Sequence, residues 1–585
     1  MGQSWSTESS EDGQLGNATI SQLQRSEVDR LFVKACVSTL LPIELVSLKQ
    51  QMALDELHGN EIITGDQLFA LLASPPNLPV KGVLFRCIQF LGKFPFLGAW
   101  EDSADITTGE MIKAIVLFSP ERRNKLFNDG FDFLKLLFLA VAATGPSFTE
   151  KAEKAEKKDQ TQAKSAVKVV SKANTVLWSK MPIVQTSDGF DFEKLAVSAQ
   201  DLVSLLTFVL VISEITIPGK SHFRLSEFDT AFSNWGLYEK RAMILLRSFL
   251  PSATRSKTQG SVNFALFERI VTGTMPEVFS PLSSFMDSLL FVNPPGPESG
   301  MIQQENTKVI TPYTLSQLAT FLPAELVYGR MKKLYVASEA GFSMRSFQSK
   351  VFKWNAPTIL FVSGFRVRET KNKRYEQFKE HFPNFRKTNP DADTTYPNDN
   401  DDGEKLTFGA YIAQPWKISN KDCFGDSGSM LFQISPHQSI FKARKIDQHY
   451  AYFNTNGGGI GFGNDQPLLK SNTKRYQPGN VSLTIDSSLE FAVFRHLGRG
   501  GTYQEGSIYG EEQAPEYEDR FSVTDLEVWG CGTEKDLAEQ AKQWEWEQKE
   551  ALARQRVNVK NLGEERAFLE MAGLVGGHGA SGGSM

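Results

Sequence analysis

The sequence predicts an α+β protein with a helical N-terminal half and a β-sandwich in its C-terminal half. Apolar residues from Ser26 to about Phe291 recur at helical spacing. Beyond residue 300, short alternating apolar runs are separated by Gly, Asn, Asp and Ser, which is typical of antiparallel strands. A Pro/Gly break at 293–297 divides the two patterns, and at 585 residues we expect two to four domains.

The composition is that of a globular protein without a strong electrostatic field. Hydrophobic residues make up 41% of the chain and the formal net charge is −5, so no overall positive field would gather nucleic acid or an anionic membrane. Cys36, Cys87, Cys423 and Cys531 lie far apart, which favours reduced thiols over a zinc site or a disulfide framework. We therefore expect a cytoplasmic protein without a cofactor or a metal ion.

Residues 1–25 are predicted to be a flexible leader, because they are polar and lack the apolar segment of a secretory signal. The leader begins MGQSWS, which matches the N-myristoylation pattern with Gly2 as the acylated residue. A chance match is the alternative. A single acyl chain binds membranes weakly and reversibly, so a protein partner would have to supply a second contact.

Residues 26–145 are predicted to be a helical region. Its first helix follows a cap at Ser26 and carries Val28 and Phe32 on one apolar face. Thr64 and Thr107 each stand three residues before a Gln or Glu, which is the capping-box pattern that begins a helix.

A short repeat within the helical half resembles part of an EF-hand. The sequence DGFDF occurs at 129–133 and again at 188–192, like the second half of a calcium loop running into its exit helix. Calcium requires a bidentate Glu at the end of the loop, whereas Lys135 and Lys194 stand at or beside that position. We expect degenerate, metal-free EF-hand-like pairs, with an accidental match in an ordinary helical domain as the alternative.

Three further segments complete the N-terminal half. The most apolar stretches, 134–143 and 202–212, are shorter than the roughly 20 residues of a membrane span and are predicted to be core helices. Residues 146–185 are rich in Lys and are predicted to be a solvated linker or an exposed helix. Residues 186–292 form the second predicted helical region.

The C-terminal half is predicted to be mainly strands. The predicted strands are 358–363, 408–412, 429–434, 450–453, 481–485, 490–494 and 526–529. One helix interrupts them, with Phe347, Val351 and Trp354 on one face. Residues 369–403, rich in Asn, Asp and Pro, are predicted to be a long solvated insertion.

A charged helix is predicted at 534–570, followed by a flexible Gly/Ser tail at 571–585. Leu537, Trp544 and Leu552 lie along one side of the helix. Such a stripe packs on its own domain or, as the alternative, enters the groove of a partner.

One segment invites a catalytic interpretation. Residues 423–429 read CFGDSGS, close to the sequence around the nucleophile of chymotrypsin-like proteases. Ser427 would need a histidine base held by a carboxylate, and none of the 7 histidines lies in the sequence context of that family. We expect a turn before a strand and no hydrolase. A peroxide-consuming thiol at Cys423 is the other enzyme hypothesis, with only Lys421 as a nearby cation.

The glycine-rich residues 457–463 raise the question of a phosphate cradle. They lack the G-K-[ST] of a P-loop, so close packing between strands at a bend is the preferred interpretation. No zinc-finger spacing or basic recognition helix indicates a nucleic-acid module. Binding of DNA at chromosome ends, the remaining hypothesis of this class, would depend on the Lys-rich segment 150–180.

Several segments of the C-terminal half, in order, resemble the TLDc domain family over residues 300–531. These include LYVAS at 334–338, GFS at 341–343, FGDS at 424–427 and LEVWG at 526–530. The residues that match its signature, structural or at an interface, are Gly341, Phe342, Phe408, Gly409, Tyr411, Trp416, Phe424, Gly425, Asp426, Ser427, Gly461, Gly463, Glu527 and Trp529.

The whole layout resembles the fungal restriction of telomere capping family. The resemblance implies a two-sheet sandwich flanked by helices, no catalytic residues, and binding to peripheral subunits of the vacuolar-type proton ATPase. We expect a non-catalytic regulator of that pump, linked genetically to telomere capping. It would be cytoplasmic and attached peripherally to the vacuolar membrane by one acyl chain, with no nucleic-acid partner and no small-molecule substrate. The alternatives are a factor that protects against oxidative stress and a cytoplasmic protein that influences telomere capping indirectly.

Overall fold

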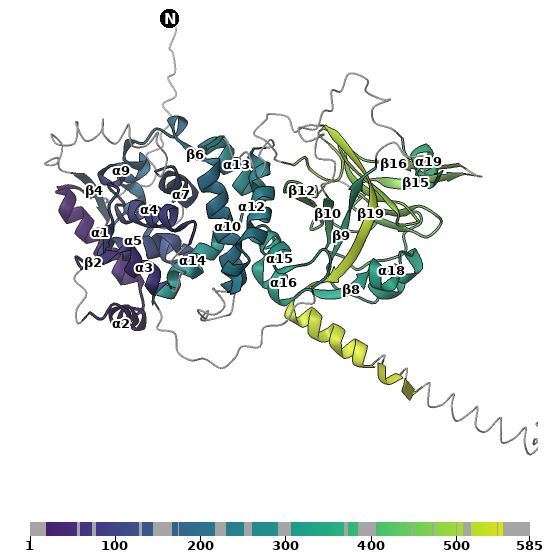
Figure 1. The fold of residues 1–585 in the computed structure, drawn as a ribbon, viewed down its shortest axis with the longest axis horizontal. Helices are drawn as coiled ribbons and strands as arrows, with labels where there is room; N and C mark the ends of the chain where they lie inside the picture. Colours follow the sequence, from purple (N-terminus) through teal and green to yellow (C-terminus); the bar gives the residue numbers. More distant parts are fainter. Residues whose placement is uncertain are drawn as a thin grey trace, which may run out of the picture.

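The computed structural model describes a helical body and a sheet-containing body that lie next to each other, with a last helix projecting from the second (Figure 1). The described residues are 19–54, 59–72, 78–127, 131–143, 167–172, 175–216, 230–250, 260–290, 306–367, 373–383, 405–445, 448–470, 473–498, 500–506, 516–546, 548–550 and 552–553. The predicted α+β class is confirmed.

Helices dominate the N-terminal half. Its α-helices are α1 (Arg25–Thr39), α2 (Pro42–Gln51), α3 (Gly65–Leu71), α4 (Lys81–Gly92), α5 (Thr108–Phe118), α6 (Pro120–Phe127), α7 (Phe133–Ala142), α9 (Pro182–Gln185), α10 (Ala199–Ile215), α12 (Trp235–Phe249), α13 (Phe264–Thr274) and α14 (Ser280–Asp287). Short 3-10 turns are η1 (Leu97–Ala99), η2 (Trp178–Lys180), η3 (Ser187–Gly189), η4 (Phe192–Lys194) and η5 (Ser288–Leu290). Its strands are β1 (Thr19–Leu23), β2 (Ile62–Thr64), β3 (Asp105–Thr107), β4 (Val167–Lys172), β5 (Thr175–Val176), β6 (Ala196–Ser198) and β7 (Ser261–Asn263).

Two predicted helix starts are confirmed and one is wrong. Thr64 and Thr107 each accept a hydrogen bond from the backbone amide three residues later, which closes a capping box. Helix α1 begins at Arg25, one residue before the predicted Ser26 cap, because the extended backbone of Gln24 already ends the preceding strand there.

One hydrophobic core runs through the whole helical half. It joins α1, α4, α5 and α7 to α10, α12, α13 and α14, so the two predicted helical regions, 26–145 and 186–292, fold as one unit. The most apolar helices, α7 and α10, are buried in this core, as predicted. Within the described part of the chain, no single helix is long and apolar enough to cross a membrane; α1 and α2 pass that test only as a pair bent by 109°.

The predicted linker 146–185 is wrong over its second part. Strand β4 pairs with β1, and Val169 lies in the core beside Trp178 and Met181. The many Lys residues led to the prediction of a solvated segment, although its apolar side chains are close enough together in the sequence to form a strand with a buried side. Residues 146–166 lie outside the described part of the chain.

The helical half contains paired helix–loop–helix units, but not where the repeat predicted them. Strand β2 pairs with β3, and β6 with β7, and each strand runs directly into a helix. Of the predicted repeat, Asp129 and Gly130 lie outside the described residues, and Asp188 accepts a hydrogen bond from the Gly98 amide at 2.7 Å. Asp188 therefore fastens one helical region to the other. Among the described residues, no group of three or more His, Cys, Asp or Glu side chains could hold a metal ion.

The C-terminal half is built on antiparallel strands. They are β8 (Lys332–Val336), β9 (Thr358–Arg366), β10 (Leu406–Ile412), β11 (Met430–Ser435), β12 (Ser439–Lys442), β13 (Ala451–Asn454), β14 (Gly459–Phe462), β15 (Asp465–Lys470), β16 (Thr473–Gln477), β17 (Val481–Ile485), β18 (Phe491–His496) and β19 (Tyr517–Gly530). The helices are α15 (Pro312–Leu318), α16 (Ala324–Gly329), α17 (Ala337–Ala340), α18 (Met344–Val351) and α19 (Lys373–His381). Every predicted strand overlaps an observed one.

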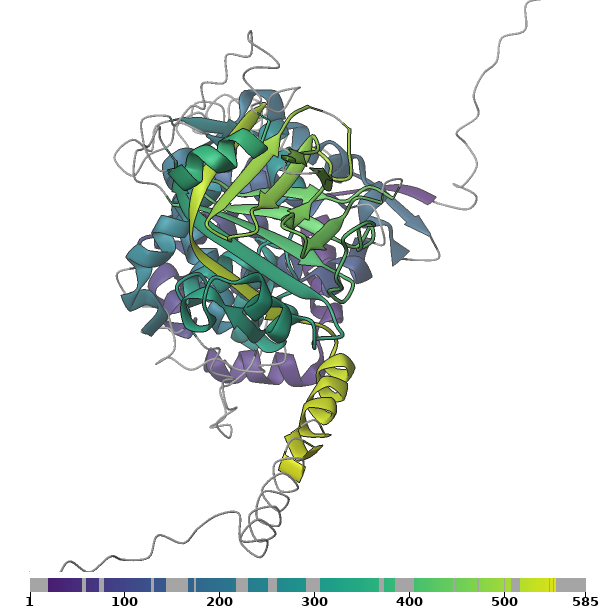
Figure 2. The same ribbon diagram turned by 90° about the vertical axis from the view of Figure 1, so that its right-hand side faces the viewer.

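The predicted sandwich has two layers that belong to one continuous sheet. Nine strands follow the order β12-β11-β10-β9-β19-β18-β17-β14-β13, and β8, the tenth strand of the sheet, pairs with β19. The sheet folds over itself, so that Phe408 on β10 stacks on Phe494 on β18 with ring centroids 4.4 Å apart. Strand β19, yellow in Figure 2, is long and curved and pairs with strands of both layers.

Successive side chains along β9 point to opposite faces of the sheet and belong to two different hydrophobic cores. Leu360 and Val362 point between the two layers, whereas Ile359 and Phe361 point outwards to a cluster formed with α15 and α16. Both faces of this strand are buried, which explains its nearly continuous apolar sequence.

The predicted solvated insertion 369–403 is wrong at its beginning. Helix α19 buries Tyr375 and Phe378, and Phe382 follows, in an aromatic cluster on the second layer of the sandwich. These residues have the i, i+3, i+7 spacing of a helix face. The charged residues between them led to the prediction of a solvated segment. Residues 384–404 lie outside the described part of the chain.

The loop between β11 and β12 joins the sandwich to the helical half. The Gln438 side-chain amide donates to the Thr274 carbonyl at 2.8 Å and to the Thr320 hydroxyl at 2.9 Å. Its side-chain oxygen accepts a hydrogen bond from Gln317 at 3.1 Å, and its backbone carbonyl accepts one from Ser248 at 2.8 Å. Gln438 is fully buried, so these hydrogen bonds replace those that its polar groups would make with water. They also hold the two halves in a fixed relative position.

His437, the neighbour of Gln438, is held neutral in this junction. Burial lowers its pKa to about 3, and the positive charges of Arg366 and Arg247 act in the same direction. The unfolded chain binds a proton at a pKa of about 6.5. The stability that depends on the neutral ring is therefore fully present above about pH 6.5 and is lost as the pH falls towards 3.

We expect Gln438→Ala to uncouple the two halves. The change removes the three side-chain hydrogen bonds of Gln438 and takes this donor from the Thr274 carbonyl in the helical half, at a cost of about 1–3 kcal/mol for a buried group left unpaired. Calorimetry should resolve two unfolding transitions where the wild-type chain gives one. Gln433→Ala is the matched control, because Gln433 is equally buried but bonds only to Ser435 and Tyr517 inside the sandwich. A single transition in Gln438→Ala would contradict the expectation.

We expect acid to weaken the junction through His437. The free energy of unfolding should be about 2 kcal/mol lower at pH 5 than at pH 7. At pH 5 the ring of the unfolded chain is protonated, whereas the buried ring stays neutral. Urea unfolding at both pH values measures the difference, and His437→Gln should reduce it. An unchanged pH dependence in His437→Gln would show that other groups are responsible.

Candidate interaction surface

The FGDS segment forms a tight turn before β11, as the sequence predicts. Phe424 exchanges backbone hydrogen bonds with Ala451 at 2.8 and 2.9 Å, which ties the turn to β13. Gly425 has a φ of +103°, and a Cβ there would lie 2.8 Å from Tyr450. The Asp426 carboxylate accepts a hydrogen bond from the Gly428 amide at 2.8 Å and closes the turn.

Ser427 is exposed at the tip of this turn. Its hydroxyl makes no hydrogen bond with any residue that the structure describes, so no histidine there is placed to take its proton. The geometry of a serine nucleophile, in which a base contacts the hydroxyl directly, is not formed by these residues.

Most other signature residues are buried and build the core. Phe408 stacks between the layers, and the Trp416 indole donates to the Thr358 hydroxyl at 2.7 Å while packing among the rings of other buried aromatic residues. Burial raises the pKa of Tyr411, in the outer cluster, to about 12, so its hydroxyl stays neutral. Their role is structural.

The signature glycines mark close approaches between neighbouring strands. A Cβ on Gly409 would lie 2.2 Å from the ring of Phe432, and one on Gly461 would lie 2.3 Å from the ring of Tyr452. Gly463 has a φ of +75° as well as no room for a side chain. Strand β14 is buried between β13 and β17, so the glycine-rich segment is a packing feature and not a phosphate cradle.

Glu527 and Trp529 anchor the start of the domain to its last strand. The buried Glu527 carboxylate accepts hydrogen bonds from the Thr307 hydroxyl at 2.7 Å and from the Val309 amide at 3.2 Å. The Trp529 indole donates to the same carboxylate at 3.1 Å. Burial raises the pKa of Glu527, while these donors act in the opposite direction.

Gly341 and Phe342 lie at the surface end of α17. Gly341, with a φ of +86°, ends the helix, and its carbonyl accepts a hydrogen bond from the Tyr335 hydroxyl at 2.7 Å. The Phe342 side chain is 39% exposed. Of the signature residues, Phe342 and Ser427 therefore offer exposed side chains, but on different elements, and the signature as a whole is not one site.

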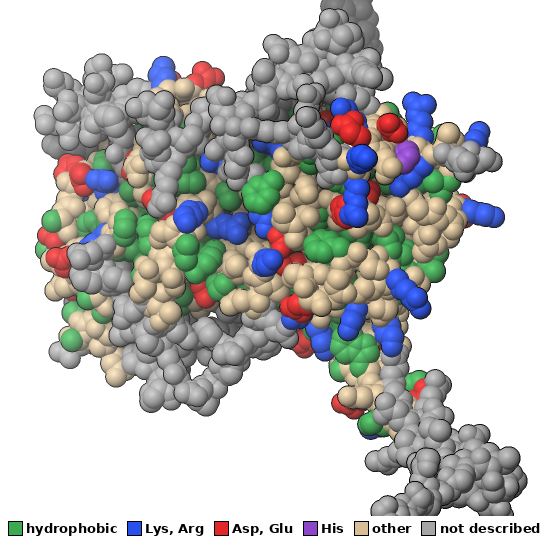
Figure 3. All heavy atoms as spheres, turned by 45° about the vertical axis from the view of Figure 1, so that its right-hand side comes forward, with side chains coloured by type: hydrophobic (Ala, Val, Ile, Leu, Met, Phe, Trp, Pro, Cys, Tyr) green, Lys and Arg blue, Asp and Glu red, His purple; other side chains and the backbone are tan. Residues whose placement is uncertain are grey.

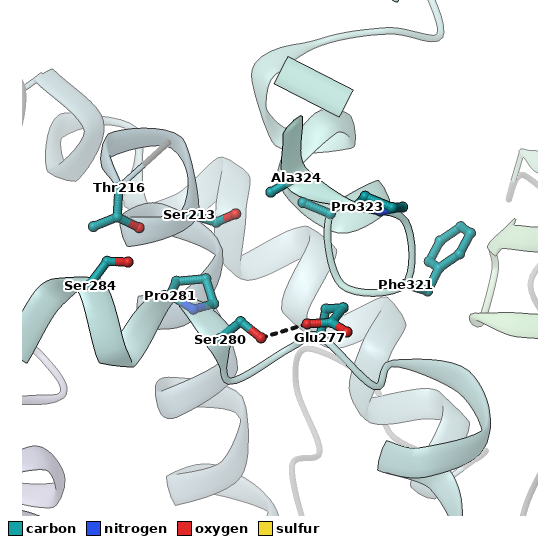
Figure 4. Close-up of a pocket in the computed structure, with 10 residues that line it drawn as sticks. Ser213, Thr216, Glu277, Ser280, Pro281, Ser284, Phe321, Pro323 and Ala324 are labelled. Atoms are coloured by element: carbon teal, nitrogen blue, oxygen red, sulfur yellow. Dashed lines mark hydrogen bonds between the residues drawn. The ribbon is translucent and has the colours of Figure 1, made fainter. Parts of the chain in front are cut away.

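A cavity of about 390 Å³ lies between the helical half and α15–α16 (Figure 4). Hydroxyl groups of Ser213, Thr216 and Ser284 line it together with apolar residues. Its carboxylate, Glu277, is exposed and accepts a hydrogen bond from Ser280 at 2.7 Å. These lining residues include no nucleophile paired with a base. We therefore interpret the cavity as a gap in the packing between the helical half and α15–α16.

Within the described residues, the last helix is attached to the sandwich through its beginning. Residues 534–546 are helical, and Gln540, the buried residue of this stretch, bonds to the Lys353 carbonyl at 2.8 Å and the Asn355 amide at 3.1 Å. Trp544 packs on Trp354 with ring centroids 5.8 Å apart. The predicted packing stripe is therefore only partly formed.

The outer part of this helix is uncovered by the described residues. Trp546 is 64% exposed and Leu552, predicted to belong to the packing stripe, is 52% exposed. Exposed Lys332 and Lys353 lie at the root of the helix: the Lys332 ammonium lies 4.1 Å from the centroid of the Trp544 ring, and the Lys353 carbonyl bonds to Gln540. Figure 3 shows blue side chains in this region. Residues 554–585 and Gly2 lie outside the described part of the chain.

Sequence reasoning missed one group of side chains. His449 places Nδ1 2.9 Å from an Asp465 carboxylate oxygen and 3.9 Å from the Cys423 sulfur. The three residues belong to three separate loops and strands, and no local sequence signal connects them. Lys421, the cation that the sequence offered, is exposed.

Comparison with known proteins gives a consistent result. The TLDc domain family matches residues 303–532, which agrees with the predicted range 300–531. Proteins named restriction of telomere capping protein 5 are similar over the full length: that of Komagataella phaffii is 42% identical and that of Kluyveromyces lactis 37%, each over 100% of both chains. The protein of that name from Saccharomyces cerevisiae S288c is 38% identical over 93% of both chains, and the shared name states no reaction. The chain therefore belongs to the restriction of telomere capping protein 5 family, and its C-terminal half is a TLDc domain.

Proposed function

We propose that this chain is a non-catalytic regulator that binds peripheral subunits of the vacuolar-type proton ATPase, in the cytoplasm and at the vacuolar membrane. The family supplies the expected partner. The observation that carries the proposal is the last helix, which leaves the sandwich and presents an uncovered Trp546.

The helix has the form of a recognition element. Its root is fixed by Gln540 and Trp544, so its direction is set before a partner arrives. Its outer turns present Trp546 and Leu552, and a helix with such apolar side chains enters the hydrophobic groove of a partner. The lysines around the root favour a groove with an acidic rim.

The acyl chain at Gly2 supplies a second, weak contact in this proposal. One acyl chain gives marginal membrane binding, and one helix gives limited affinity for a membrane-bound pump. Because both contacts belong to one chain, the second forms at a high effective concentration once the first is made. Regulated attachment at the vacuole is the expected outcome.

An indirect effect fits the name of the relatives better than contact with DNA. The net charge of −5 offers no general attraction to a phosphate backbone. The Lys-rich residues 150–166 lie outside the described part of the chain. We propose that an effect on telomere capping would follow from pump activity or from protection against oxidative stress.

We expect Trp546→Glu to reduce recovery of the pump by about tenfold or more in a pull-down from solubilised vacuolar membranes, because a buried interface Trp contributes about 2 kcal/mol or more. Mass spectrometry of the peripheral subunits measures the recovery. Gln548→Glu is the matched control, since it places the same charge on the same exposed helix. Equal recovery with Trp546→Glu and the control would refute a role for this helix.

We expect Gly2→Ala to move the chain from the vacuolar membrane fraction to the soluble fraction, because Ala cannot accept the acyl group. Fractionation and intact mass measure location and acylation together. Ser4→Ala, which keeps the recognition pattern, should behave as wild type. Unchanged fractionation of Gly2→Ala would remove the membrane contact from the proposal while leaving the test of the helix unaffected.

A further inference from the structure

Cys423 differs from the other cysteines in its surroundings. Cys36, Cys87 and Cys531 are buried, and burial raises the pKa of both Cys87 and Cys531 to about 12, which keeps those thiols protonated and inert. Cys423 is partly exposed, directly before the FGDS turn. Cys423 therefore keeps part of its surface open to solvent, from which a small molecule can approach it.

The sandwich holds a histidine and a carboxylate beside this sulfur. His449 Nδ1 lies 3.9 Å from the Cys423 sulfur, and an Asp465 oxygen lies 2.9 Å from the same nitrogen. Backbone hydrogen bonds fix the arrangement: Phe424 pairs with Ala451, and the Gly463 amide donates to the His449 carbonyl at 3.1 Å. The three side chains are therefore placed by strands β13–β15 and by the turn, and not by their own flexible contacts.

The arrangement differs from a hydrolase triad in a way that defines its chemistry. In a triad the base uses one ring nitrogen for the nucleophile and the other for the carboxylate. Here the sulfur and the carboxylate both approach Nδ1 of His449. The hydrogen on Nδ1 that the Asp465 carboxylate accepts also faces the Cys423 sulfur, so the ring can donate to the thiolate once the thiol proton has left to water. A hydrogen bond to the charged form of a group favours that form, and the thiolate is the nucleophilic form of a thiol.

We propose that Cys423 is a site of reversible thiol–disulfide exchange with a small-molecule disulfide such as oxidised glutathione, and that His449 is its positioning residue. The Cys423 proton leaves to water, and the sulfur, now a thiolate, attacks one sulfur of the disulfide. A new S–S bond forms at Cys423 as the old one breaks, and the departing thiolate takes a proton from water. The products are a mixed disulfide and one small thiol, so no further oxidant is required.

Modification at this position would alter a surface that the family signature shapes. The adduct would stand directly before the FGDS turn, whose Ser427 is exposed. Reduction by another thiol reverses the step and restores the original surface.

The test is the pH dependence of adduct formation on the folded full-length chain. The chain is incubated with oxidised glutathione at several pH values, quenched with acid, and analysed by intact mass and peptide mapping. We expect the adduct on Cys423 and none on Cys423→Ser. In His449→Gln the rate at pH 7 should fall about tenfold, and the rate should rise only as the pH approaches that of an ordinary thiol, about 8.5.

Two further variants separate a hydrogen bond that stabilises the thiolate from mere packing. Asp465→Asn keeps the shape beside Nδ1 but removes the charge, and should shift the pH profile in the same direction as His449→Gln. His381→Gln carries the same substitution on another partly exposed histidine and should leave the rate unchanged. Equal pH profiles for wild type and His449→Gln, or adducts on the buried cysteines of the folded chain, would overturn the proposal.

Discussion

Strand β19 is the constraint on which the C-terminal half depends. It pairs with β18 through its first half, with β9 along most of its length and with β8 at its end. A register shift between Val523 and Asp525 lets one strand serve both layers of the sandwich. Glu527 on the same strand holds the first segment of the domain, and the last helix begins directly after it. The direction of that helix is therefore set by the sheet.

The TLDc signature describes how this sheet closes and does not describe a reaction. Phe408 and Trp416 fill the space between the layers, and Gly409 and Gly461 allow rings to lie against the backbone. Residues of this kind tolerate few substitutions because interiors are closely packed. Function is then free to reside in the exposed parts attached to the sandwich, such as the last helix and the surface beside Cys423.

The helical half also limits which surfaces are available. Helices α15 and α16 cover the outer face of β9 and β11, and α15 is itself packed against α10 and α12. Gln438 locks this contact, since its hydrogen bonds reach α12, α13 and the end of α15. One face of the sandwich is thus committed to internal packing, and partners must use the remaining faces or the last helix.

The sequence by itself determined features whose signals lie within a few residues. The capping boxes at Thr64 and Thr107, strand β17 and the FGDS turn depend on neighbours in the chain, and each was predicted correctly. Tertiary structure alone decided the single helical core, the packing of α19, and the meeting of Cys423 with His449. These contacts join residues far apart in sequence, and their energy comes from burial that only the assembled fold provides.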